Sequence, residues 1–299
     1  MQKLYSNKIL LNTSPHTFGE LLESVPDSSN LPFLREQLEK NGYLLFRGFL
    51  NPESIHKCKR SIVSDLKQNN SFLAQSKDYK NKKYKETLYC GGIASIRDLI
   101  KKGPIIDIFS MIFGEPATSF DYVWSRIKGP GVSEIPHCDS VFMQGTKNLY
   151  NAWIPLMDIP LNMGPIMILD KSHSLDRLNS YRSLDVDADR IKRMLVFKHG
   201  KFFQGVQYSK NPDKVQKEFG LRWLTTDFHI GDVLIFSAHA LHCTLDNNTD
   251  KLRISVDARY QPKSESIDNR YMGENPIGHR KIKPIPSSLK NILNYFRLV

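Results

Sequence analysis

The feature that most limits how this chain can fold is a series of short apolar or alternating segments that begins near residue 118. Gly, Pro and Asn separate the segments, which come in two blocks around a charge-mixed stretch at about 176–220. Alternation bounded by turn residues predicts β-strands. No helical pattern alternates with these strands, so antiparallel pairing is favoured over a parallel α/β sheet. We therefore expect an all-β core with flanking helices, as an antiparallel double-sheet barrel or jelly roll.

The part of the chain before residue 118 has a different pattern and is predicted to be α-rich. Apolar residues at helical spacing predict helices at 30–43, 52–68 and 95–114, with a buried strand at 42–49. Pro32 near the start of the first helix and Gly42 near its end are typical helix boundaries. The third segment is expected to break at Gly103.

These patterns suggest one domain rather than several. We interpret residues 1–299 as a single domain with an α-rich N-terminal part (1–117), a jelly-roll core (118–262) carrying an insert at about 176–220, and a C-terminal extension (263–299). Apolar spacing at 287–296 predicts a closing amphipathic helix in that extension. No internal repeat or low-complexity tract is detected.

Composition excludes several protein classes. Four cysteines show no CxxC pair and no disulfide-framework spacing, so reduced thiols in a cytoplasmic protein are favoured. No apolar run approaches the length of a membrane span, and the first residues lack the pattern of a signal peptide. We therefore expect a cytoplasmic protein that makes no membrane contact. The sequence leaves the oligomeric state open.

The net charge of +11 can mark nucleic-acid binding, an anionic small substrate or a lysine-rich organismal bias, and its densest cluster is the lysine-rich stretch 77–86. Basic residues interleaved with tyrosines can bind single-stranded nucleic acid. No nucleic-acid motif accompanies the cluster, so we interpret 77–86 as a solvated loop, with a lid over an active site as another hypothesis. Nucleic acid is the less favoured partner, and a small-molecule substrate is preferred.

Two good metal ligands stand one residue apart in "PHCDS" (136–140). On a β-strand, His137 and Asp139 would point to the same face and could bind one ion, while Cys138 would point away. Any single one of the nine histidines is more often structural than a ligand, so a third ligand is needed. His239 and His242 lie in a strongly apolar segment, and because they are three apart only one of them should face the cavity.

A candidate anion site follows in "KLRISVDARY" (251–260). Arg253 and Ser255 share one strand face, which places a guanidinium beside a hydroxyl. An arginine in an apolar strand needs an anionic partner, either a protein carboxylate or a carboxylate ligand. If the strand is regular, alternation also places Arg259 on the face of Arg253, where it could reach the mouth of the cavity. Arg126 and Arg259 could each bind an anionic substrate, and surface charge or internal ion pairs are the alternative for both.

Two histidines and one carboxylate match the facial triad of non-haem Fe(II) oxygenases, which leaves three coordination positions open. Zinc is the main competitor on ligand type alone. The Arg-x-Ser pair favours iron, because a chelating 2-oxo acid would have a distal carboxylate for Arg253 to bind. A cupin-like metal-binding protein that never activates oxygen remains an alternative, as does an oxygenase acting on nucleic acid.

The same segments resemble the phytanoyl-CoA dioxygenase-like Fe(II)/2-oxoglutarate oxygenases. The resemblance runs from "NGYLLFRGFL" through "ENPIGH" and rests on "HCD", "WIPLMDIPLNMGPIMILDKSH", "GDVLIF" and "HCTLDNNTDKLRIS". It implies a double-stranded β-helix, the jelly roll of cupin-like proteins. It also implies a dioxygenase that uses Fe(II), 2-oxoglutarate and O2, and that hydroxylates a small molecule while forming succinate and CO2.

The resemblance also assigns roles to particular residues. The family arginine follows the distal histidine by eleven residues, which selects His242 over His239 as the partner of Arg253. His137, Asp139 and His242 are then the implied catalytic iron ligands. Arg253, Ser255 and Trp153 are implied to lie at the cosubstrate, with packing in the core as the alternative for Trp153. Cys138 and Cys243 are interpreted as small core residues turned away from the metal.

Overall fold

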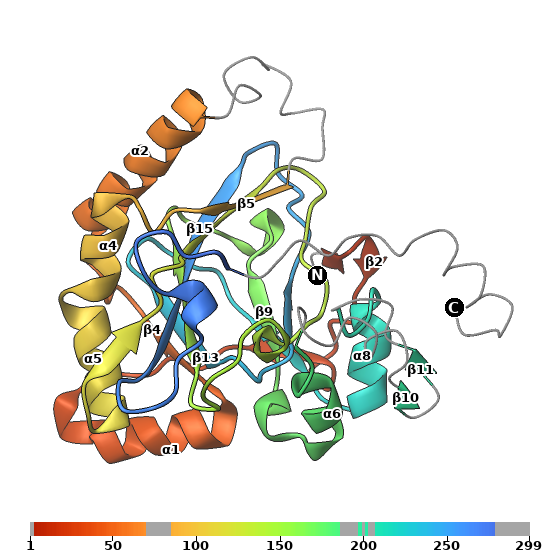
Figure 1. Cartoon of the computed structure of the whole chain (residues 1–299). Coiled ribbons are helices and arrows are strands. Elements are labelled where there is room, and N and C mark those ends of the chain that lie inside the picture. Colours follow the sequence, from red (N-terminus) through yellow and green to blue (C-terminus); the bar gives the residue numbers. More distant parts are fainter. Residues whose placement is uncertain (1–2, 70–84, 186–196, 199–200, 203–206, 279–299) are drawn as a thin grey trace, which may run out of the picture.

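The computed structural model describes residues 3–69, 85–185, 197–198, 201–202 and 207–278. Its centre is a pair of β-sheets, as the strand pattern predicts (Figure 1). The larger sheet has the order β4-β13-β8-β15-β7-β5, and β6 also pairs with β15. The smaller sheet has the order β14-β9-β12-β3. All of these strand pairs are antiparallel except β12 with β3, so the all-β jelly roll is confirmed.

The strands of the two large sheets have the following bounds. In the larger sheet they are β4 Tyr43–Phe46, β5 Lys85–Tyr89, β6 Ala117–Ser119, β7 Trp124–Lys128, β8 Tyr150–Pro155, β13 Val233–Ser237 and β15 Arg253–Pro262. In the smaller sheet they are β3 Phe18–Glu20, β9 Ile166–Leu169, β12 Trp223–Thr225 and β14 His242–Thr244. Two separate hairpins are β1 Tyr5–Ser6 with β2 Ile9–Leu10, and β10 Phe197–Lys198 with β11 Lys201–Phe202.

Helices cover the outer face of the larger sheet. The α-helices are α1 Leu31–Asn41, α2 Pro52–Asn69, α4 Ala94–Lys101, α5 Pro104–Phe113, α6 Asn179–Arg182 and α8 Pro212–Phe219. Short 3-10 helices lie at Ser28–Asn30, Asp139–Val141, Leu161–Met163, Ser172–Ser174, Asp176–Leu178 and Asn269–Tyr271. Helices α2, α4 and α5 lie along one side of the sheets, and α6 and α8 lie on the other (Figure 1).

Strand β15 explains how the core and the site are separated. Its even-numbered residues Ile254, Val256, Ala258 and Tyr260 belong to the apolar cluster that includes the buried faces of α1, α2, α4 and α5. Because successive side chains alternate, its odd-numbered residues point to the other face, between the sheets. Those residues are Arg253, Ser255, Asp257, Arg259 and Gln261, and all are buried. The strand therefore presents only polar and charged side chains to the interior.

The predicted N-terminal helices and strand are confirmed. Helix α1 starts with a proline in its first turn and ends at Gly42, which adopts φ 78° and donates its N–H to Leu38. The predicted break at Gly103 separates α4 from α5. Strand β4 is buried throughout and lies in the larger sheet, so the N-terminal part also contributes strands.

Two segments differ from the predicted strands. The segment around Pro136 forms no regular strand but a single bridge between His137 and His242, followed by the 3-10 helix that starts at Asp139. Proline lacks a donor for a sheet ladder, which explains the short pairing. The apolar run at 233–241 is also interrupted, because β13 and β14 belong to different sheets and the chain turns at 238–241 between them.

The lysine-rich and insert predictions are only partly covered by the structure. Residues 85–86 begin strand β5 rather than continuing a loop, and 77–84 lie outside the described residues. The described part of the insert at about 176–220 contains α6, α8 and the β10–β11 hairpin. The predicted helix at 287–296 also lies outside the described residues. Among the residues that the structure does describe, no helix is long and apolar enough to span a membrane.

Candidate metal centre and cosubstrate site

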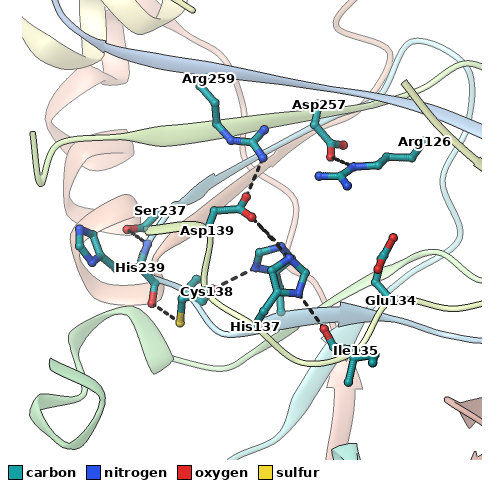
Figure 2. Close-up of polar contacts among 12 residues, drawn as sticks. Arg126, Glu134, Ile135, His137, Cys138, Asp139, Ser237, His239, Asp257 and Arg259 are labelled. Atoms are coloured by element: carbon teal, nitrogen blue, oxygen red, sulfur yellow. Dashed lines mark hydrogen bonds and ion pairs between the residues drawn. The ribbon is translucent and has the colours of Figure 1, made fainter. Parts of the chain in front are cut away.

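His137, Asp139 and His242 converge between the two sheets. One potential ligand atom from each side chain lies within 4.8 Å of the others. The bridge between His137 and His242 sets the two imidazoles side by side, with ring centroids 4.3 Å apart. Asp139 starts the 3-10 helix immediately after this bridge, and its carboxylate turns back toward the rings (Figure 2). The structure therefore brings the three predicted ligands together.

Hydrogen bonds orient both imidazoles for metal binding. The Nδ1 atom of His137 donates to the Ile135 carbonyl at 2.7 Å, and Nδ1 of His242 donates to the Ala240 carbonyl at 3.0 Å. Each Nε2 is then the basic nitrogen. These two Nε2 atoms lie 3.4 and 3.8 Å from Oδ1 of Asp139. A backbone carbonyl that fixes the ring and its tautomer in this way is typical of metal-binding histidines.

A buried arginine compensates the Asp139 carboxylate. Arg259 Nη2 donates to Asp139 Oδ2 at 2.8 Å, and both side chains are almost completely buried (Figure 2). Burial alone would raise the pKa of Asp139, but Arg259 and the two histidines hold that pKa well below its usual range. Asp139 is therefore an anion without a metal, and the site is prepared to receive a cation.

The predicted cosubstrate residues form a second group on the interior face. Arg253 is 1% exposed, and its Nη1 donates to the Gly164 carbonyl at 2.6 Å while Nη2 donates to Ser255 at 3.2 Å. The guanidinium carbon lies 5.6 Å from the centroid of the Trp153 ring. Gly164 has φ 78°, and a Cβ there would meet the Leu245 carbonyl oxygen at 2.5 Å, so the close approach requires glycine.

Arg253 has no charge partner within the part of the chain that is described. No ion pair among those residues includes it, and its Nε has no hydrogen-bond acceptor. Burial lowers the pKa of Arg253 to about 10, with Asp257 and Glu134 opposing that shift. A buried guanidinium in this state is suited to an anionic ligand.

A small cavity adjoins the triad. Its volume is about 100 Å³, and it is lined by Trp124, Arg126, Glu134, Ile135, His137, Asp139, Phe142, Met143, Gln207 and Arg259. Arg126 donates through Nε to Asp257 at 2.6 Å (Figure 2). Its Nη1 donates to Thr87 at 3.4 Å. The two arginines predicted as substrate residues thus both reach this cavity, and each also makes an internal ion pair.

The neighbouring cysteines and His239 do not join the triad. Cys138 is buried in a separate apolar cluster that also contains Cys243, as the sequence predicts for both. The Cys138 thiol donates to the His239 carbonyl at 3.3 Å, and burial raises the pKa of that thiol to about 12. The His239 side chain points away from the triad (Figure 2).

Acid should destabilise the metal-free protein below about pH 6.5. Burial lowers the pKa of His239 and that of His242 to about 4, from an ordinary value of 6.5. Between these values the unfolded chain binds more protons than the folded chain, so the free energy of unfolding falls as pH falls. One histidine with a shift of this size contributes roughly 3 kcal/mol.

Urea unfolding at about pH 7 and about pH 5, with a chelator present, measures this effect. His239→Gln should reduce the difference between the two conditions, because one of the two buried imidazoles is then absent. An undiminished difference in that variant would contradict the assignment to His239.

Comparison with known proteins identifies the family. The family model described as phytanoyl-CoA dioxygenase (PhyH) matches residues 38–255, a range that includes the triad and Arg253. The chain belongs to the phytanoyl-CoA dioxygenase family. A search of curated proteins finds no match to this family member.

Solved structures of similar fold include three enzymes with low sequence identity. The non-haem alpha-ketoglutarate-dependent epimerase SnoN from nogalamycin biosynthesis is 16% identical with a TM-score of 0.57, and the match covers 87% of this family member and 98% of SnoN. The carbocyclase SnoK from the same biosynthesis is 14% identical with a TM-score of 0.58 and the same two coverages. EctD from S. alaskensis, solved with 2-oxoglutarate and 5-hydroxyectoine, is 13% identical with a TM-score of 0.55, over 92% of this chain and 91% of EctD. These matches agree with the jelly-roll fold.

Several residues around the triad were not predicted. The contact between Arg259 and Asp139 joins strand β15 to the turn after His137, and the sequence separation of 120 residues gave no signal for it. Trp124 and Phe142 line the cavity, and Phe142 packs edge-on against His137 at 6.0 Å between ring centroids. The alternation of β15 placed Arg253 and Arg259 on one face, but it could not identify their partners.

Proposed function

We propose that this phytanoyl-CoA dioxygenase family member is an Fe(II)/2-oxoglutarate-dependent dioxygenase that hydroxylates a small molecule. The observation that carries this proposal is the combination of a buried triad of two imidazoles and a carboxylate with a buried arginine that has no charge partner among the described residues. When bound, iron and 2-oxoglutarate supply oxygen activation, with conversion of the cosubstrate to succinate and CO2.

The triad fits a divalent transition metal. His137, Asp139 and His242 would hold it, through two Nε2 atoms and Oδ1. A set of two imidazoles and one carboxylate with open positions is typical of non-haem Fe(II) sites. The chain's own contribution is to keep both imidazoles correctly turned, that of His242 neutral and the Asp139 carboxylate ionised, before the metal arrives.

Arg253 fits the distal carboxylate of 2-oxoglutarate. Its Nε lacks an acceptor, and no described carboxylate pairs with it. Ser255 holds one edge of the guanidinium, and Trp153 packs against it. SnoN has been solved with Fe3+ and alpha-ketoglutarate, which supports the same cofactors for this chain.

The substrate would enter the cavity beside the triad. Arg126 is the better candidate for contact with an anionic group, since its Nη2 has no hydrogen-bond partner in the described structure while its Nε and Nη1 are occupied. Arg259 remains a weaker candidate because its Nη2 is bonded to Asp139. The cavity of about 100 Å³ has room for the reacting part of a small substrate beside the triad.

The wild-type protein should form a visible charge-transfer band when Fe(II) and 2-oxoglutarate are added without oxygen. The band requires Fe(II) in the triad with 2-oxoglutarate bound to that same ion. It therefore tests the triad and the Arg253 site together. A subsequent screen of small metabolites should show substrate-dependent succinate release. Absence of the band in the wild-type protein would contradict the proposal.

The mass of the product separates hydroxylation from related outcomes. Hydroxylation adds one oxygen atom, ring formation or desaturation removes two hydrogens, and epimerisation leaves the mass unchanged. A product lacking the added oxygen would retain the Fe(II)/2-oxoglutarate assignment but overturn the hydroxylase assignment.

A further inference from the structure

The two oxygens of the Asp139 carboxylate have different surroundings. Oδ1 faces the Nε2 atoms of His137 and His242 at 3.4 and 3.8 Å, while Oδ2 accepts a hydrogen bond from Arg259 at 2.8 Å (Figure 2). Asp139 is 3% exposed and Arg259 is 1% exposed. Because the pair is shielded from water, the charge-assisted bond to Oδ2 has no competing solvent partner.

Arg259 is itself fixed in place. Its Nη1 donates to the Ala258 carbonyl at 3.3 Å, and its guanidinium carbon lies 4.6 Å from the centroid of the Trp124 ring. The side chain projects from the interior face of β15, which pairs with both β7 and β8. These contacts hold the guanidinium in place, so its bond to Oδ2 opposes rotation of the carboxylate.

We propose that Arg259 is a positioning residue that restricts Asp139 to metal binding through one oxygen. The inference rests on the proposed function. A facial triad leaves three of six positions open, two for the chelating 2-oxo acid and one for oxygen. Carboxylates can bind a metal through one oxygen or two. Binding through both oxygens of Asp139 would occupy a position that the cosubstrate or oxygen needs, and the contact of Oδ2 with Arg259 prevents it.

The role differs from a purely structural ion pair in what it controls. A structural pair affects the stability of the fold, whereas Arg259 would affect how many positions remain open on the metal. Loss of the guanidinium should therefore leave the affinity for Fe(II) nearly unchanged and lower the affinity for 2-oxoglutarate. The Nη2 atom of Arg259 donates to Asp139 and so is not available to a substrate anion. Arg259 and Arg126 therefore have different roles, the first in positioning Asp139 and the second in contacting substrate.

Calorimetry without oxygen tests the inference, first with Fe(II) and then with 2-oxoglutarate on the metal-loaded protein. For Arg259→Met we expect a 2-oxoglutarate dissociation constant raised about tenfold or more, the size of effect seen for residues that support metal ligands. The Fe(II) dissociation constant should stay within about threefold of wild type, because the released Oδ2 can itself bind the metal and so offset the loss of orientation. The charge-transfer band should weaken in parallel. Arg259→Lys keeps the positive charge but lacks the planar fork, so we expect an intermediate loss of about threefold.

Arg47→Met is the control for loss of an arginine–aspartate pair outside the metal site, with an arginine side chain that is 26% exposed. Arg47 donates to Asp232, which is 2% exposed, at 2.8 Å, and neither residue belongs to the metal site. This variant should lose stability and keep both affinities. Wild-type 2-oxoglutarate affinity in Arg259→Met, with a loss of stability like that of Arg47→Met, would show a structural role and overturn the inference.

Two further outcomes are decisive. If Arg259→Met does not fold, Arg259→Lys decides, and wild-type cosubstrate affinity in that variant overturns the inference. If the wild-type protein binds neither Fe(II) nor 2-oxoglutarate, the proposed function fails and the role of Arg259 fails with it. Normal wild-type binding together with an unaffected Arg259→Met variant overturns the role of Arg259 alone.

Discussion

Asp139→Asn is expected to abolish Fe(II) binding, with a loss of more than about 100-fold in affinity, beyond the range seen for residues that only support metal ligands. An amide has one oxygen where the carboxylate has two. Arg259 requires an acceptor at the position of Oδ2, 2.8 Å from its Nη2. The amide oxygen should therefore turn toward Arg259, leaving the NH2 group facing His137 and His242. An NH2 group cannot bind a metal cation.

The same substitution should also lower stability, because Arg259 loses its charged partner. Breaking a buried ion pair by removing one member costs about 3–5 kcal/mol. Asp232→Asn is the matched control, since Asp232 pairs with Arg47 and is equally buried. It should lower the free energy of unfolding but leave Fe(II) affinity unchanged. Calorimetric Fe(II) affinity of Asp139→Asn equal to wild type would refute the ligand assignment.

The site could be predicted where local spacing determines geometry. A strand with strict alternation fixes which residues share a face, so Arg253, Ser255 and Arg259 were correctly expected on one side of β15. The grouping of His137 with Asp139 also followed from their spacing, although the segment forms a single bridge and a 3-10 turn rather than a strand. The local pattern thus predicted which side chains lie together better than it predicted the type of secondary structure.

The interactions between distant segments could not be predicted in the same way. The run "VLIFSAHAL" (233–241) is apolar throughout, because β13 and the turn after it are both buried, so hydrophobicity did not reveal where the chain leaves one sheet for the other. The contact between Arg259 and Asp139 depends on that turn and on the position of β15. Such contacts arise from the packing of the two sheets, which a single sequence does not encode in any short pattern.

The two buried arginines of β15 have opposite electrostatic situations in the metal-free protein. Arg259 has its counter-ion in place, whereas the hydrogen-bond partners of Arg253 in the described part of the chain are a carbonyl and a hydroxyl. A buried cation without a counter-ion opposes folding, and binding of a dianion relieves that opposition. The protein therefore holds one ion pair complete and leaves the other for its cosubstrate to complete.

Arg253→Met should consequently lose 2-oxoglutarate affinity without losing stability. Removing one member of a buried, hydrogen-bonded charge pair costs about 2–5 kcal/mol, or roughly 30-fold to several thousand-fold in the dissociation constant. In the metal-free protein the same change removes a desolvated charge, and the melting temperature should stay the same or rise. Arg253→Lys, which keeps the charge but not the fork, should recover only part of the affinity.

Two measurements check this pattern: calorimetry of 2-oxoglutarate with the metal-loaded variant, and thermal melting of the metal-free variant. If Arg253→Met binds 2-oxoglutarate with wild-type affinity, Arg253 is not part of the cosubstrate site. A melting temperature several degrees lower would show that Arg253 already has a stabilising partner within the fold. The contrast with Asp139→Asn, which should lower both metal affinity and stability, distinguishes a charge that the fold has already paired from one that awaits a ligand.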